Sequence, residues 1–305
     1  MAKKVLAGVV LGVVFLGALA VSMRAQAPAS STYSQMRWRS IGPPRAGRAR
    51  ALSGVRSQPN VFYIGFDNGG VWRSTDYGST WTPLFDSQTT GSIGAIAVAP
   101  SDPNVIYVGS GAGIIRPDLA TGDGVYKSTD AGKTWTHLAQ LRDTSMIANI
   151  EVDPRNANRL FVAALGHPYG PNAERGIFRS TDGGGTFEKV LYKDEYVSGN
   201  DVRINPSDPN VVYASLWQQQ QSYIEGGAFG GTAQSNDGGI FKSTDGGTTW
   251  KQLSGGLPGV QQANLAIAPS NPSVLYATIA CIGGCPAGAP GPAGATPGGA
   301  PGGGG

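Results

Sequence analysis

Charge and helical periodicity are both scarce in this sequence. Only 14% of the 305 residues are charged, and no long stretch repeats its apolar residues at helical spacing. Glycine and proline are abundant instead, with 47 and 21 residues, a composition typical of many short strands joined by turns. Lys3, Lys4 and Arg24 at the N-terminus account for the whole formal net charge of +3. The rest of the chain is neutral and gives no electrostatic reason to expect a nucleic acid or an anionic membrane surface as partner.

The residue types that metal and nucleophile chemistry needs are also few. Cys281 and Cys285 are the only cysteines, and with two distant histidines they are too few for a zinc site. In an oxidising compartment the two thiols either form a local disulfide or stay free. No Gly-x-Ser-x-Gly elbow and no phosphate-binding loop occurs. We therefore expect no metal and no cofactor.

The two ends of the chain differ in composition from its middle. Two lysines precede an apolar run and then small residues, so residues 1–27 have the pattern of a secretory signal peptide. An uncleaved membrane anchor is the alternative, because the run is near the lower length limit for a spanning helix. A short linker, 28–35, follows, and the Gly/Pro/Ala-rich end, 281–305, is predicted to be disordered. We expect an extracytoplasmic protein, periplasmic or secreted, with no membrane contact after cleavage.

A nine-residue motif, which we call the box, occurs four times. KSTDGGTTW, at 242–250, shares with the other copies the order basic residue, Ser, Thr, Asp, any residue, Gly, any residue, Thr, aromatic residue. A second motif of the type SDPNV occurs five times, and from its second copy on it advances along the chain in the same steps as the box, 54, 52 and 63 residues. Identical steps indicate that the two motifs belong to one repeating unit. The other boxes are at 73–81, 127–135 and 179–187.

Each unit is predicted to contain four short strands. Four-stranded units of this length are the blades of a β-propeller, so we predict an all-β propeller over residues 36–280. It is expected to have four whole blades and the first half of a fifth. In the second unit the strand-like stretches, bounded by Pro, Gly, Asn or Asp, are 93–100, 105–109, 124–128 and 134–138.

Each box is predicted to be the hairpin turn between the third and fourth strands. Its Asp side chain accepts hydrogen bonds from backbone N–H groups of the turn, its Gly takes a positive φ, and its aromatic residue is buried at the start of the outer strand. The motif resembles the Asp-box, or bacterial neuraminidase repeat, of sialidases, sortilin-type receptors, xyloglucanases and photosystem assembly factors. This resemblance implies a structural rather than a chemical role for the box aspartates, Asp76, Asp130, Asp182 and Asp245.

The loops that join second and third strands are expected to lie opposite the boxes, because successive hairpins alternate between the two ends of a propeller. They differ between units: the first is tight, 66–70, and the others are longer, 110–124, 165–176 and 217–239. Long insertions on one face of a repeat scaffold indicate a binding face, although ordinary packing is the alternative for each side chain. The candidate binding residues are Arg116, His167, Tyr169, Trp217, Tyr223 and Phe229.

Two longer stretches carry a second resemblance. LGHPYGPNAERGIFRSTDGG, at 165–184, and WRSIGPPRAGR, at 38–48, resemble a large group of secreted bacterial proteins labelled glycosyl hydrolase or sortilin N-terminal domain. FDNGGVWR, at 66–73, is similar to the Asp-x-Gly-Gly-x-aromatic-Arg stretch of xyloglucanase-type propellers, which implies a nucleophile or base role for Asp67. In that family the second carboxylate comes from another propeller. The same DNGG sequence is also a good tight turn.

Two functions are consistent with these observations. The leading hypothesis is a secreted binding or scaffolding propeller whose ligand is a protein, a peptide or a glycan. The alternative is a glycoside hydrolase of xyloglucanase-like type that uses Asp67. A sialidase is disfavoured, because the chain lacks the Phe/Tyr-Arg-Ile-Pro start of that family.

The predicted fifth blade has an unpaired edge. Its second strand, 274–280, precedes the Gly/Pro-rich end, and the strand-like residues 38–41 have no blade of their own. An exposed apolar edge is a template for pairing with another chain. We therefore expect residues 26–305 to self-associate.

Overall fold

The computed structural model describes residues 47–113, 120–167, 169–218 and 237–280, and every regular element within them is a β-strand. All of these residues belong to one compact unit, Arg45–Gly305. The predicted signal peptide, the linker, the strand-like residues 38–41, both cysteines and the C-terminal segment lie outside the described residues. The described part contains no helix with the length and apolarity needed to cross a membrane.

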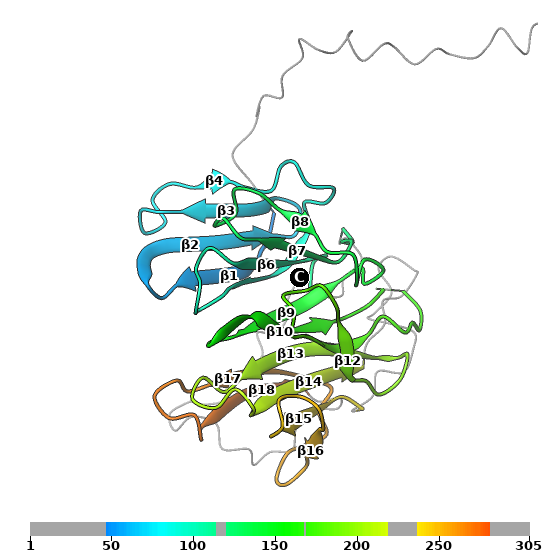
Figure 1. Cartoon of the computed structure of the whole chain (residues 1–305). Helices are drawn as coiled ribbons and strands as arrows, with labels where there is room; N and C mark the ends of the chain where they lie inside the picture. The colour runs from blue at the N-terminus through cyan, green and yellow to red at the C-terminus, as the bar shows by residue number, and fades with distance from the viewer. Residues whose placement is uncertain (1–46, 114–119, 168, 219–236, 281–305) are drawn as a thin grey trace, which may run out of the picture. The chain divides into compact units, whose positions relative to one another are not determined.

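The strands form five antiparallel sheets in chain order, which confirms the all-β prediction of four blades and half of a fifth (Figure 1). Blade 1 contains β1 (Ala49–Val55), β2 (Gln58–Phe66), β3 (Gly70–Ser74) and β4 (Thr82–Pro83). Blade 2 contains β5 (Ile93–Val98), β6 (Ile106–Ser110), β7 (Val125–Ser128) and β8 (Thr136–His137). Blade 3 contains β9 (Ile147–Asp153), β10 (Asn156–Ala164), β11 (Gly176–Ser180) and β12 (Glu188–Leu191). Blade 4 contains β13 (Val197–Ile204), β14 (Val212–Gln218), β15 (Gly239–Ser243) and β16 (Lys251–Leu253), and blade 5 contains β17 (Gln262–Ile267) and β18 (Leu275–Ala280).

The hydrophobic core lies between consecutive blades. Side chains alternate along each second strand, so Tyr107 of β6 packs in the cluster shared with blade 3, whereas Ile106 packs in the cluster shared with blade 1. Similar clusters fill the joint between blades 3 and 4 and the joint between blades 4 and 5. Blades 2, 3 and 4 are therefore each held by a neighbour on both sides.

In each blade, the turn between the first and second strands and the turn between the third and fourth strands meet at one end, which we call the turn face. In all four complete blades the backbone N–H of the residue after the box Asp donates to the carbonyl of the Asn in the second repeated motif. This contact gives a physical reason why the two motifs recur together. The four bonds are Tyr77 to Asn60 at 3.1 Å, Ala131 to Asn104 at 3.0 Å, Gly183 to Asn158 at 2.7 Å and Gly246 to Asn210 at 2.9 Å.

The opposite end, which we call the loop face, carries the connections between the second and third strands of each blade. It also carries the segments that lead from one blade to the next. These two kinds of segment hydrogen-bond to each other along the chain. The N–H of Gly70 donates to the carbonyl of Gly91 at 2.8 Å, and the N–H of Gly122 donates to that of Ser145 at 2.7 Å. The loop face is therefore built from segments that lie far apart in the sequence.

The box turns have the same internal geometry in every blade. In the first, the Ser74 hydroxyl donates to Asp76 Oδ1 at 2.8 Å and accepts the N–H of Gly78 at 2.8 Å, and Thr80 donates to both Asp76 oxygens, from its N–H at 2.9 Å and its hydroxyl at 2.6 Å. Gly78 has a φ of 86°. One expectation was wrong in degree, because the box aromatic residues are half-buried rather than buried. Trp81 lies over its own turn, where its Nε1 donates to the carbonyl of Gly78 at 3.0 Å.

Candidate functional site

Asp67 lies on the loop face, in the short turn between β2 and β3. The turn is held from both sides, because the N–H of Asp67 donates to the carbonyl of Arg48 at 3.0 Å and Trp72 Nε1 donates to the carbonyl of Gly69 at 2.6 Å. Gly70, which ends the turn, has a φ of 69°. Asp67 is only 4% exposed, so this turn holds a carboxyl group almost out of water.

Arg50, on β1, is electrostatically coupled to this carboxyl group. Its guanidinium donates to the carbonyl of Gly113 on the β6–β7 connection at 2.7 Å. Desolvation lowers the pKa of Arg50, and the charges of Asp67 and then Asp201 act in the opposite direction. Arg50 itself remains exposed. The loop end of blade 1 therefore combines a buried carboxyl group with an exposed guanidinium that feels its charge.

The inner strands of blades 1 to 4 line a cavity of about 450 Å³. Its polar side chains include those of Arg50 and Asn149, together with Glu151 of β9 and Arg203 of β13. The Asn149 carbonyl oxygen Oδ1 is buried without a hydrogen-bond partner among the described residues. The cavity therefore combines charge with an unsatisfied acceptor.

Glu151 supplies the carboxyl group of the cavity lining, and its pKa is raised. Burial raises its pKa to about 7, against the opposing charge of Arg203, whose Nη1 lies 3.5 Å from Glu151 Oε2. The neighbouring carboxyl group of Asp201 adds to the increase. Asp201 is itself tied to blade 5, because it accepts the N–H of Leu265 at 2.7 Å. The pKa of Glu151 is therefore raised well above its ordinary range at a point where three blades meet.

The β10–β11 connection is organised by a residue that the sequence did not single out, Arg175. This side chain is fully buried and donates to Ser198 Oγ at 2.5 Å and to the carbonyls of His167 and Gly170 at 3.2 and 3.1 Å. Burial lowers the pKa of Arg175 to about 10, although nearby acidic groups, Asp194 first, oppose the shift. The only sequence signal was a charged Glu-Arg pair directly before the glycine that begins β11.

The two predicted residues on this connection are accessible. His167 exposes 46% of its side chain, and its Nε2 lies 3.9 Å from Glu174 Oε2. Tyr169 is 38% exposed. Both side chains are therefore accessible to solvent, and their role in binding a ligand stays a prediction.

Trp217 has a different environment from the one expected of a surface aromatic residue. It is 6% exposed at the end of β14, in a small apolar cluster with Ala112, Met146 and Leu165. Its indole Nε1 is buried without a hydrogen-bond partner within the described residues. Trp217 thus packs against residues of the loop-face segments of blades 2 and 3 and brings an unsatisfied donor to this cluster.

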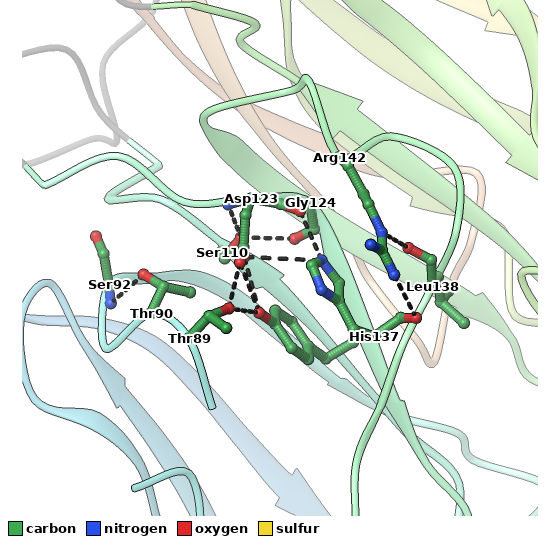
Figure 2. A network of polar contacts seen from close by, with 10 residues as sticks. Thr89, Thr90, Ser92, Ser110, Asp123, Gly124, His137, Leu138 and Arg142 are labelled. Atoms are coloured by element: carbon green, nitrogen blue, oxygen red, sulfur yellow. Dashed lines mark hydrogen bonds and ion pairs between the residues drawn. The ribbon is translucent and has the colours of Figure 1, made fainter. Parts of the chain in front are cut away.

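The β6–β7 connection is fastened at both ends by a polar network around Asp123 (Figure 2). The Asp123 carboxylate accepts the hydroxyl of Thr89 at 2.5 Å, the hydroxyl of Tyr126 at 2.8 Å and that of Ser110 at 3.2 Å. His137 contacts the Asp123 carbonyl through Nε2 at 2.7 Å and stacks on the Tyr126 ring. Because its hydroxyl groups and the Asp123 carboxylate all have internal partners, we interpret this network as a support for the connection that precedes β7.

The remaining predicted residues fall into two sets. Arg116, Tyr223 and Phe229 lie outside the described residues. The box aspartates lie on the turn face, away from Asp67, and hydrogen bonds within each turn lower their pKa. The lowered pKa is about 2 for Asp76, Asp130 and Asp182, and Asp245 shifts in the same direction.

Comparisons with known proteins agree with this architecture. Residues 123–261 match the family model described as sortilin, neurotensin receptor 3. Xyloglucanase Xgh74A of Acetivibrio thermocellus is 28% identical over 250 residues, which cover 73% of this chain and 27% of that protein. A xyloglucanase of Hypocrea jecorina is 27% identical over 263 residues, which cover 78% of this chain and 29% of that protein. This chain thus spans less than a third of the length of these relatives.

Solved structures show the same likeness. The crystal structure of an ancestral GH74 enzyme superposes with a TM-score of 0.59 at 26% identity, covering 79% of this chain and 28% of that one. The GH74 xyloglucanase from Xanthomonas campestris has a TM-score of 0.54 at 18% identity, over 75% of this chain and 35% of that one, and shows the fold alone. The described chain is therefore a β-propeller, similar to part of the xyloglucanases and to the sortilin family model.

Proposed function

We propose that this chain is an extracytoplasmic glycan-binding propeller and that the loop face around Asp67 binds a β-glucan of the xyloglucan type. The observation that carries this proposal is the placement of Asp67, 4% exposed in the DNGG turn and electrostatically coupled to Arg50. The named xyloglucanases among its relatives support the choice of ligand class.

The chemistry of the loop face suits a sugar. Sugar hydroxyl groups both donate and accept hydrogen bonds, and buried charged groups form stronger hydrogen bonds with them than neutral groups do. Asp67 supplies an acceptor and Arg50 a donor, while Tyr169 and His167 supply accessible rings on which a sugar can lie. The face therefore offers both polar recognition and apolar contact.

Calorimetric titration with xyloglucan oligosaccharides tests this proposal. We expect Asp67→Asn to weaken binding about tenfold or more, because the charged acceptor is lost. Asp86→Asn is the matched control, since Asp86 is an exposed residue of the segment between β4 and β5 on the same face. Equal thermal stability of the two variants would show that the effect is local. Failure of the unchanged protein to bind any xyloglucan, cellulose or mixed-linkage glucan oligosaccharide would contradict the proposal.

Hydrolysis of the glycan is the second candidate function. It is favoured by the match of FDNGGVWR to the xyloglucanase stretch and by the burial of Asp67, since burial is one way to tune a carboxyl group for acid–base work. A glycosidase needs two carboxyl groups across the scissile bond, and Asp67 would be one of them.

Release of reducing ends from xyloglucan separates the two functions. If the chain hydrolyses the polymer, Asp67→Asn should lower the rate about a thousandfold while Asp86→Asn leaves it unchanged. Binding without any release of reducing ends would leave the binding function and exclude the hydrolytic one.

A further inference from the structure

An aromatic residue of the second strand recurs in the joints between blades. Tyr63 of β2, Tyr107 of β6 and Phe161 of β10 occupy the same position after the turn and are at most 1% exposed. Their contacts reach the next blade: the hydroxyl of Tyr63 donates to the carbonyl of Ala131 at 3.3 Å, and that of Tyr107 donates to the carbonyl of Ala157 at 2.9 Å. Each of these side chains fills the joint with the blade that follows.

An aliphatic residue of the first strand meets this aromatic residue from the other side. Ile96 shares a core cluster with Tyr63, Ile150 shares one with Tyr107, and Val202 shares one with Phe161. These three aliphatic side chains are at most 8% exposed. Each of these joints therefore includes an aromatic residue from the preceding blade and an aliphatic residue from the following blade.

Within the part of the chain that the structure describes, two residues occupy these positions without a counterpart. Tyr276 of β18 stands at the aromatic position of blade 5 and is 65% exposed. Leu52 of β1 stands at the aliphatic position of blade 1 and is 69% exposed. Blade 5 thus presents the first half of a joint and blade 1 presents the second half.

We propose that these two faces bind each other between copies of this chain, so that the Tyr276 face of blade 5 in one copy packs on the Leu52 face of blade 1 in the next. A second copy of the chain suits these faces because each copy carries both halves of a joint that its own blades already form repeatedly. Such a contact joins two different surfaces and is therefore head-to-tail, which makes either a ring or an open chain of copies.

The competing arrangement uses the edge of β18 instead of its face. In that case Leu275–Ala280 would pair with the same strand of another copy through main-chain hydrogen bonds. That dimer would be symmetric and would not involve blade 1. The two arrangements therefore predict different behaviour for a change at Leu52.

Sedimentation velocity of the purified full chain, over about a hundredfold range of concentration, is the first measurement. We expect the unchanged protein to form species larger than a monomer as the concentration rises. Leu52→Lys and Tyr276→Lys should each raise the apparent dissociation constant about tenfold or more, because either change places a charge in the joint. Both side chains are exposed within one copy, so thermal melts should show unchanged folding. Tyr196→Lys is the control, since Tyr196 is 47% exposed between β12 and β13, and it should associate like the unchanged protein.

Mixing the two blocked variants is the decisive test. Leu52→Lys retains an intact Tyr276 face and Tyr276→Lys retains an intact Leu52 face, so the mixture should form a dimer of one copy of each and nothing larger. A monomer at every concentration of the unchanged protein would overturn the proposal. Association of Leu52→Lys alone at the affinity of the unchanged protein would overturn it in favour of edge pairing. No dimer in the mixture would overturn it outright.

Discussion

The turn face and the loop face of this propeller are built in opposite ways. On the turn face, all four boxes repeat one set of contacts, with the Ser hydroxyl donating to the Asp carboxylate at 2.7 to 2.8 Å and accepting the Gly N–H at 2.8 Å. On the loop face, each connection is stabilised by different contacts: a three-residue turn at Asp67, a carboxylate network at Asp123 and a buried arginine at Arg175. Uniform chemistry thus maintains the fold, and the variable face is where a ligand site can differ from blade to blade.

The largest loss of stability should come from substituting the box glycine that has a positive φ. Gly184 has a φ of 91°, and a Cβ atom there would lie 2.4 Å from Leu138 Cδ1 of the neighbouring blade. We expect Gly184→Ala to lower the free energy of unfolding by about 2–4 kcal/mol, from backbone strain and overpacking together. Gly255→Ala is the control: no atom lies within 4 Å of its Cβ position, so its effect should stay within about 0.5 kcal/mol. Equal melting curves for the two variants would show that the boxes do not hold the joints between blades.

The box serine should have the next largest effect. Ser243 is 1% exposed, and its hydroxyl accepts the N–H of Gly247 at 2.8 Å while donating to Asp245 at 2.7 Å. Ser243→Ala leaves that N–H buried without its acceptor, and we expect a loss of about 1–3 kcal/mol in urea unfolding. Ser254→Ala, at an exposed position after β16, should be neutral. A neutral Ser243→Ala would mean that water replaces the hydroxyl.

A smaller and pH-dependent effect is expected for the box carboxylates. Hydrogen bonds from the Thr186 N–H and hydroxyl and from Ser180 lower the pKa of Asp182 from 3.8 to about 2. Because the folded-state pKa lies below that of the unfolded chain, the ionised carboxylate stabilises the fold above about pH 4, and this contribution is lost as the pH falls through about 2. Asp182→Asn should therefore be less stable than the unchanged protein at pH 6, and the difference in melting temperature should shrink towards pH 2. A difference that stays constant with pH would contradict this assignment.

The two faces also differ in how far the sequence predicts them. The nine residues of a box contain the turn's own donors and acceptors, so the roles of Asp76 as acceptor and Gly78 as left-handed residue follow from local chemistry. The function of the box Ser as the centre of the turn was missed, because a hydroxyl has many possible partners in a sequence. The strands of blade 2 were predicted to within about two residues, since alternation and turn residues both limit them.

The candidate site depends on contacts that no local pattern contains. Glu151 has its raised pKa because β13 brings Asp201 and Arg203 beside it from a later repeat, and Arg50 is coupled to Asp67 across two strands of one blade. Trp217 is aromatic and lies in a loop-like stretch, yet it is buried by residues of three different segments. Such neighbours are set by how the blades pack, so the sequence named some of the residues but not their environments.

The smallest change in stability is expected for a substitution of the residue before the box glycine, and this substitution should stabilise the protein. Boxes 3 and 4 have Gly183 and Gly246 there, with φ of 73° and 72°, whereas box 2 has Ala131 with a φ of 59°. An L-residue in this conformation costs about 1–2 kcal/mol, and glycine costs about 0.5–1 kcal/mol in unfolded-chain entropy, so we expect Ala131→Gly to stabilise the protein by about 0.5 kcal/mol in urea unfolding. The matched control is Ala157→Gly in β10, whose φ is not positive, and there the same change should destabilise by a similar amount. If both changes destabilise equally, the left-handed strain is already relieved within the turn, and the two kinds of box are energetically equivalent.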